Sequence, residues 1–208
     1  SESGSIKSNT LSVKSDGAVS LLGTQNRFPV LTMAGLSGDM VGGSVHIVNT
    51  GAMTVADLAA AGNVTIMQKG ALTTGAVKTV KAGAATGDVR LHTDDKLTVR
   101  GDMDAAGSAE LTAEQDIELK NTVKTGTDLT ATATGSLTAA NVEAGDAATL
   151  TAGTKLTAQN VTAKGDAVLH AGTDLTALNV AAGKDAALTA EKNLSARDVT
   201  AGGIASLT

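Results

Sequence analysis

One tripeptide in this 208-residue chain carries side chains with a recognisable binding chemistry. Arg100, Gly101 and Asp102 place a guanidinium and a carboxylate on either side of a glycine. Integrins bind this RGD sequence through the guanidinium on one subunit and the carboxylate on a receptor-held metal ion, a hard cation that prefers oxygen ligands. The tripeptide is therefore the candidate receptor-binding site. A structural role is the alternative, in which Gly101 lets the chain bend at a corner.

The three histidines have metal-binding chemistry, but their spacing keeps them apart. His92 and His170 occupy the same outward position of a repeated unit, four repeats apart, or about 19 Å at the spacing of stacked strands. His46 is another single outward residue. We therefore expect solvent-exposed histidines that share no metal ion.

A group of carboxylates suggests either a calcium site or the carboxylate pair of a glycosidase. We assign them to different corners of the fold, as solvated turn residues, because neither an EF-hand spacing nor a glycine-rich calcium repeat is present. The chain contains no cysteine, which excludes disulfides and thiol catalysis. We expect no metal, no cofactor and no catalytic residue. The carboxylates concerned are Asp94, Asp95, Asp102, Asp104 and Asp116.

The composition narrows the possible partners. With 16 Lys and Arg against 21 Asp and Glu, the formal net charge is −5, and there is no Trp or Tyr and only one Phe. This balance argues against a nucleic-acid site, which needs basic side chains interleaved with aromatic ones. No apolar run approaches the roughly 18 to 20 residues of a membrane-spanning helix. The first ten residues lack the features of a signal peptide, so we expect either a cytosolic chain or a piece of a longer exported one.

A repeat of nineteen residues must position all of these side chains. Four columns recur at this interval in the last third of the chain, and their common phase excludes composition bias. The columns are Leu137, Leu156, Leu175 and Leu194; Val142, Val161, Val180 and Val199; Leu150, Leu169, Leu188 and Leu207; and Asn141, Asn160, Asn179 and Asp198. The first column continues towards the N-terminus through Ile117, Leu97, Leu72, Met53, Leu31 and Leu11. The pattern predicts atypical coils in residues 1–50 and one regular shaft in residues 51–208.

Within one unit the apolar residues alternate, which is typical of strands and not of a helix. In residues 175–193 we expect three short strands and three corners. The residues expected to face inward are Leu175, Ala177, Val180, Ala182, Ala186, Leu188 and Ala190, and those expected to face outward are Thr176, Ala181, Ala187 and Thr189. Residues 56–61 are rich in alanine, which has a high helix propensity, but their alternation predicts a strand and not a helix.

Stacked units of this kind predict an all-β fold, a right-handed parallel β-helix of about ten coils. The 37 Ala and 24 Gly suit its narrow interior, which a Trp or Tyr would overpack. We expect an amide stack in the Asn141 column, where Asn tolerates left-handed backbone geometry. We also expect an outward hydroxyl ladder formed by Thr32, Thr54, Thr73, Thr98, Thr138, Thr157, Thr176 and Ser195.

The repeat also places the tripeptide. Aligning Leu97 with the leucine column and Met103 with the valine column puts residues 100–102 at the asparagine corner, with Gly101 as an extra residue.

The longest unit, of 25 residues, has six extra residues near Lys81 to Gly87. This insertion has no nucleophile or base beyond Lys81, so we interpret it as a tolerated insertion.

The units with LTAxNV and LTA elements resemble the 19-residue repeats of the filamentous haemagglutinin family, adhesins exported by two-partner secretion. The resemblance covers about Met53 to Thr208 and is most specific from Gly126 onward. It implies a secreted or cell-surface rod of a Gram-negative bacterium, with an outer-membrane transporter as partner of the full-length protein. That family is also known for an RGD sequence.

Three functions follow from these patterns. The first is an adhesin shaft that displays the tripeptide to an integrin or another receptor on host cells. The second is the spacer of an interbacterial contact-dependent toxin, because such toxins share the shaft. The third is a polysaccharide-active β-helix enzyme, which short turns and the lack of aromatic side chains disfavour. We expect an adhesin and not an enzyme.

Overall fold

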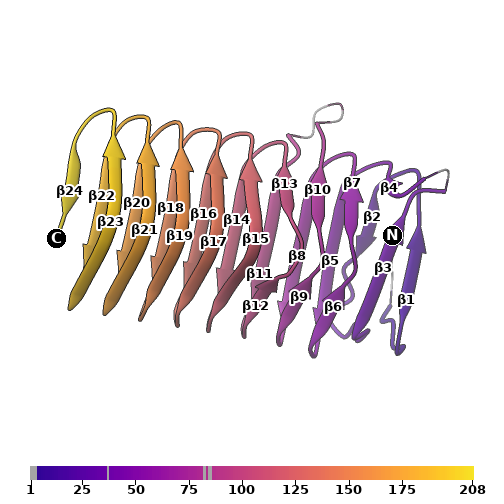
Figure 1. The fold of residues 1–208 in the computed structure, drawn as a ribbon. Coiled ribbons are helices and arrows are strands. Elements are labelled where there is room, and N and C mark those ends of the chain that lie inside the picture. Colours follow the sequence, from indigo (N-terminus) through magenta and orange to yellow (C-terminus); the bar gives the residue numbers. More distant parts are fainter. Residues whose placement is uncertain (1–3, 37, 82, 84–85) are drawn as a thin grey trace.

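The alternating pattern winds the chain into a parallel β-solenoid of about ten coils, seen from the side in Figure 1. The computed structural model describes residues 4–36, 38–81, 83 and 86–208, and its regular elements in that part are all strands. Strands of neighbouring coils pair in parallel, so the rest of the coil serves as the return connection.

The strands form three columns along the solenoid. The first column contains β1 (Leu11–Lys14), β3 (Val30–Ala34), β6 (Met53–Val55), β9 (Leu72–Thr74), β12 (Leu97–Val99), β15 (Ile117–Thr125), β17 (Leu137–Ala144), β19 (Leu156–Ala163), β21 (Asp174–Ala182) and β23 (Asn193–Ala201). The second contains β4 (Met40–Val41), β7 (Leu58–Ala60), β10 (Val77–Thr79) and β13 (Met103–Ala105). The third contains β2 (Val19–Leu21), β5 (Val45–Thr50), β8 (Val64–Lys69), β11 (Val89–Thr93), β14 (Ala109–Ala113), β16 (Leu129–Ala133), β18 (Ala148–Ala152), β20 (Ala167–Ala171), β22 (Ala186–Ala190) and β24 (Ala205–Leu207).

The prediction of three strands per coil holds only for the coils from β3 to β14, and the first coil has β1 and β2 alone among the described residues. From β15 onward the first two strands join into one long strand that keeps its ladder across the corner, so the prediction of three is wrong there. Both β12 and β13 pair with β15, and the register shifts between Leu119 and Thr122 mark the point where the two columns merge. In the later coils the corner residues remain in the sheet, so no separate turn is needed.

The inward and outward assignment is confirmed for most positions. Leu175, Val180 and Leu188 are at most 2% exposed. Ala190 is half-buried and packs against the core, as expected of an inward residue. Thr98 pairs with Thr73 in the expected hydroxyl ladder, but it is only 7% exposed, which the alternation did not predict. The buried side chains form one continuous apolar core along the solenoid.

The register confirms the leucine column at every step except one. Leu11 pairs with Leu31, and from Met53 to Leu194 each member pairs with the next. Leu31, however, pairs with Val55 and not with Met53. Pro29, which has no N–H to donate, precedes β3, and its carbonyl oxygen accepts from the Thr54 N–H at 2.7 Å. The local shift is two residues, which leaves the inward face unchanged.

The turns before the third column are tied to one another by side chains. In most coils the residue that precedes the third-column strand accepts a hydrogen bond from the backbone N–H of the equivalent residue one coil later. These acceptors and donors are Ser44 to Asn63, Asn63 to Asp88, Asp88 to Ser108, Asp128 to Ala147, Asp166 to Asp185, and Asp185 to Ile204. These side chains satisfy turn amides and help to fix the spacing of the coils.

The asparagine column forms the expected amide stack. Asn160 donates its Nδ2 to Asn141 Oδ1 at 2.7 Å, and Asn179 donates to Asn160 Oδ1 at 2.5 Å. Its backbone is not left-handed, because the described residues with a positive φ are all glycines. That part of the prediction is wrong, since the corner is a bend within a strand.

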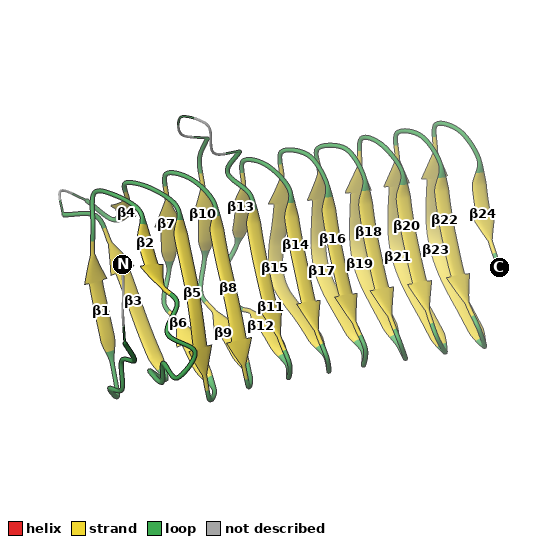
Figure 2. Cartoon of the chain, turned by 180° about the vertical axis from the view of Figure 1, so that it is seen from behind, coloured by secondary structure: helices red, strands yellow, loops and turns green. Residues whose placement is uncertain are grey.

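A long loop connects β10 to β11, both of which are labelled in Figure 2. It belongs to the 25-residue unit, and residues 82, 84 and 85 of the predicted insertion lie outside the described residues. The buried Thr79 closes the base of this loop, because its hydroxyl donates to the Gly87 carbonyl and accepts from the Ala106 N–H. The solenoid therefore resumes its spacing directly after the insertion.

Candidate functional site

The Arg100–Gly101–Asp102 tripeptide lies at the corner between β12 and β13. Leu97 pairs with Ile117, and Met103 pairs with Val123, which is the alignment that the repeat predicts. The next coil also has one extra residue between its two apolar positions, Ile117 and Val123. The tripeptide is thus a slightly lengthened version of a corner that every coil has.

Two buried side chains anchor the corner on either side. Val99 and Met103 are each 1% exposed, whereas Arg100 and Asp102 are exposed. The Arg100 N–H donates to the Thr74 carbonyl at 2.8 Å, and the Asp102 carbonyl accepts from the Val77 N–H at 2.9 Å. Because both ends are hydrogen-bonded to the preceding coil, the backbone of the tripeptide is fixed while its charged side chains face outward.

Gly101 is required by the packing of neighbouring coils. A Cβ at this position would lie 2.3 Å from the Ala76 backbone nitrogen and 2.7 Å from the Gly75 carbonyl carbon. These are backbone atoms, so no side-chain movement could relieve the clash. Any other residue would push the coils apart at this corner.

Asp102 has one structural contact. Its Oδ1 accepts from the Thr122 N–H at 3.2 Å, in the coil above. Thr122 pairs with Asn141, so Asp102 occupies the column that becomes the amide stack further along the solenoid. In the part of the chain that the structure describes, neither the second carboxylate oxygen of Asp102 nor the Arg100 guanidinium has a hydrogen bond or ion pair. The corner can therefore present one cation and one anion to a partner.

Ion pairs surround the tripeptide. Lys78 on β10 and Asp104 on β13 approach each other to 3.9 Å. Lys96 and Lys120 both contact Glu118, at 3.0 and 3.7 Å. The hydrogen bond from Lys96 lowers the pKa of Glu118 below its ordinary value; burial opposes this shift, and the charges of both lysines add to it. Glu118 therefore stays ionised near neutral pH and pairs with both lysines.

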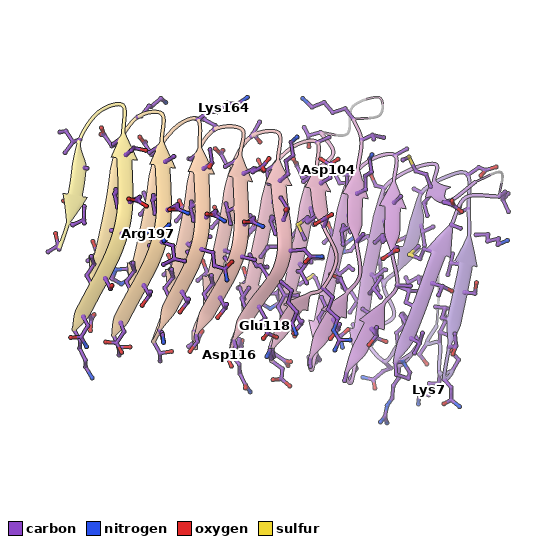
Figure 3. All side chains as sticks on the ribbon, in the orientation of Figure 1. Lys7, Asp104, Asp116, Glu118, Lys164 and Arg197 are labelled. Atoms are coloured by element: carbon purple, nitrogen blue, oxygen red, sulfur yellow. The ribbon has the colours of Figure 1, made fainter. Side chains whose placement is uncertain are left out.

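The carboxylates that suggested a calcium or glycosidase site do not converge. Asp104 lies on β13 itself, so its assignment to a corner is wrong, and Figure 3 shows it at the edge of the solenoid opposite to Asp116. Asp94, Asp95 and Asp116 share one turn column and not different corners. They accept hydrogen bonds from the backbone N–H groups of Gly70, Lys96 and Ser136 respectively.

The histidines lie on the outer face of the third column. His92 and His170 occupy one column of this face, four strand pairings apart, and His46 is exposed on β5. Across the described residues, no three His, Cys, Asp or Glu side chains lie close enough to hold a metal ion.

A groove on this face was not predicted from the sequence. It has a volume of about 510 Å³, runs outside β5, β8 and β11, and its lining includes Met67, Lys69, His92, Asp94 and Glu114. Met67 is 46% exposed there. β5 and β8 are each six residues long, one residue longer than the third-column strands from β11 to β22.

A buried polar cluster was also missed. Asn49, Gln68 and Thr93 lie near the ends of β5, β8 and β11, and Asn26 lies between β2 and β3; all four are at most 2% exposed. Asn49 and Gln68 lie nineteen residues apart, so the repeat itself was the signal, but a polar column does not look like a core position in the sequence.

Among the described residues there is no helix long and apolar enough to cross a membrane. Comparison with known proteins finds no matching family model, no matching curated protein and no matching solved structure.

Proposed function

We propose that this chain is part of the shaft of a secreted or cell-surface adhesin of a Gram-negative bacterium. In this proposal the solenoid is a rigid spacer, and Arg100, Gly101 and Asp102 form the contact with a host receptor of the integrin type. The chain itself is not an enzyme and needs no cofactor. The full-length protein would leave the cell through an outer-membrane transporter, as the resemblance of its repeats implies.

The single observation that supports the receptor contact is the presentation of the tripeptide. Exposed Arg100 and Asp102 stand between the buried anchors Val99 and Met103, on a backbone that is hydrogen-bonded to the coil below. A preorganised corner loses little conformational entropy when it binds, which favours affinity. The shaft is well suited to such display, because each corner is held by the coils on both sides.

The decisive substitution is Asp102→Asn. The amide keeps an Oδ1 acceptor for the Thr122 N–H, so the corner stays folded, but it removes the charge that a receptor-held cation requires. We expect attachment of integrin-expressing mammalian cells to the immobilised protein to fall by at least about tenfold, the loss expected when a charged contact at an interface is removed. Asp102→Glu should lose attachment as well, because the carboxylate is displaced by one methylene.

Asp104→Asn is the matched control. Asp104 is exposed two residues away and makes one long ion pair, so this variant should bind cells like the parent. Gly101→Ala is not a suitable control, because its methyl group would clash with the Ala76 backbone and disturb the fold. Equal attachment by Asp102→Asn and the parent would refute the receptor contact. Binding to bacterial outer membranes instead of mammalian cells would favour the spacer of an interbacterial toxin.

A further inference from the structure

The interior of the solenoid contains polar side chains that its apolar packing does not require. Asn49 Nδ2 donates to Gln68 Oε1 at 3.2 Å, and Gln68 Nε2 donates to the Gly51 and Lys69 carbonyls. Asn26 Nδ2 donates to the Val48 carbonyl, and the Thr93 hydroxyl donates to the Gly70 carbonyl. We call Asn26, Asn49, Gln68 and Thr93 the buried polar ladder.

The same column shows that the fold can dispense with these groups. Asn49 pairs with Gln68 and Gln68 with Thr93, but the next members of the column are Ala113, Ala133 and Ala152. All three alanines are buried in coils of regular geometry. Buried polar side chains carry a desolvation cost that an alanine avoids. Formation of a coil therefore does not require these polar side chains, and they must have another role.

The buried polar ladder lies beside β3 and β6, where the hydrophobic pattern is compatible with two registers of strand pairing. Leu31 could lie over Met53 or over Val55, since both are buried and both face inward. A two-residue slip keeps every side chain on its own face, so alternation cannot distinguish the two registers. In the structure Leu31 pairs with Val55.

One contact of the ladder distinguishes the two registers. Asn49 Oδ1 accepts from the N–H of the buried Phe28, just before β3, at 3.0 Å. A slip of two residues displaces one strand against the next by about 6.6 Å. The slip would separate Phe28 from Asn49 and leave buried polar groups without partners, a costly arrangement.

We propose that the buried polar ladder is a register lock, which selects the pairing of β3 on β6 and sets the phase of the coils around it. Buried polar groups are known to specify one register among near-equal apolar alternatives at some cost in stability. The uniform coils after β15 need no such lock, because their four columns repeat at one interval. This inference stands independently of the proposed function.

Two cysteine pairs can report the register, because the natural chain contains no cysteine. Val30 pairs with Thr54, and Val30 is 39% exposed and Thr54 exposed, so V30C/T54C can form a disulfide only in the observed register. In the slipped register Thr32 would lie opposite Thr54, and T32C/T54C would report it. Each pair is placed in the parent and in an N49L/Q68L background, and the disulfide yield is measured after mild oxidation.

In the parent we expect disulfide formation by V30C/T54C and none above background by T32C/T54C. In the N49L/Q68L background the yield of T32C/T54C should rise at least about tenfold, the shift that loss of one buried hydrogen bond produces in a register equilibrium. A T74V background, which removes a buried hydroxyl outside the ladder, should behave like the parent.

Exclusive cross-linking of V30C/T54C in the N49L/Q68L background would overturn the register lock. Circular dichroism shows whether that background keeps its β structure. If it does not, Asn49→Leu alone provides the same test, because it removes the acceptor of the Phe28 N–H while leaving Gln68 in place. The same two yields then support or overturn the proposal.

Discussion

Thr74 is a buried residue whose hydroxyl lacks a partner. Its Oγ1 has no hydrogen bond to any described residue, and the side chain is 0% exposed between Val55 and Val99, its partners in neighbouring coils. The buried Thr79, Thr93 and Thr125, by contrast, each donate to a backbone carbonyl. An unsatisfied hydroxyl in an apolar column is a local source of instability.

Replacement of Thr74 by valine should therefore stabilise the protein. The two side chains have nearly the same shape, and the substitution removes the desolvation cost of the hydroxyl. We expect the free energy of unfolding to rise by about 1 kcal/mol, measured by urea denaturation of the two proteins side by side. Thr138→Val, at an exposed position of the first column, is the matched control and should change stability by less than about 0.5 kcal/mol. A less stable Thr74→Val variant would contradict this assignment of the buried face.

The sequence predicts the position of some residues but not the structural role of others. The corner position of residues 100–102 followed from two aligned apolar columns, because the spacing fixes where a corner must fall. The roles of Asp116 and Asp166 did not follow from spacing, since a hydrogen bond to the next coil's amide depends on turn geometry that the sequence pattern does not carry. The burial of Thr98 was not predicted, because alternation gives the face on which a residue lies and not how far its neighbours cover it.

At the scale of elements, vertical stacking of identical side chains holds the solenoid together. Leu150, Leu169 and Leu188 pair in sequence along the third column and are each 0% exposed. A strand of five residues has little stability alone, so most of its stabilisation comes from the coils above and below.

Loss of one inward leucine should therefore be costly. Leu169→Ala removes buried apolar surface and leaves a cavity between two fixed neighbours, so we expect a loss of about 2 to 5 kcal/mol. Thr176→Ala, on the outward face of β21, should cost less than about 0.5 kcal/mol. Urea unfolding measures both variants. Comparable losses in the two would show that the inward and outward faces were assigned wrongly.

Strands could be predicted from the sequence where the alternation of apolar and polar residues allowed only one interpretation. Alternation correctly placed a strand, β7, within the alanine-rich residues 56–61, because periodicity reports burial while propensity reports only a local preference. The joining of two strands from β15 onward was not predictable, since a bent strand and two strands separated by a turn have the same alternation. The step from Leu31 to Val55 was also missed, because two registers satisfy the same hydrophobic pattern.

The whole molecule is a rod whose length follows from the number of coils. Ten strands stack in the first column, which corresponds to about 45 Å at the spacing of neighbouring strands. Each coil contacts mainly the coils before and after it, so the architecture resembles a one-dimensional stack. The fold class was predictable from the period alone, whereas the buried polar ladder and the groove beside Met67 depend on coils that depart from the period.

The most direct test of this winding measures distances between spin labels placed on one outward column. Val48, Thr112 and Thr189 belong to this column, with three pairings between the first two and four between the last two. For labels at 112 and 189 we expect a separation of about 19 Å, and for labels at 48 and 189 about 34 Å. Separations that grow in proportion to the number of coils would support nineteen residues per turn of a parallel solenoid. Distances that fail to scale in this way would contradict it.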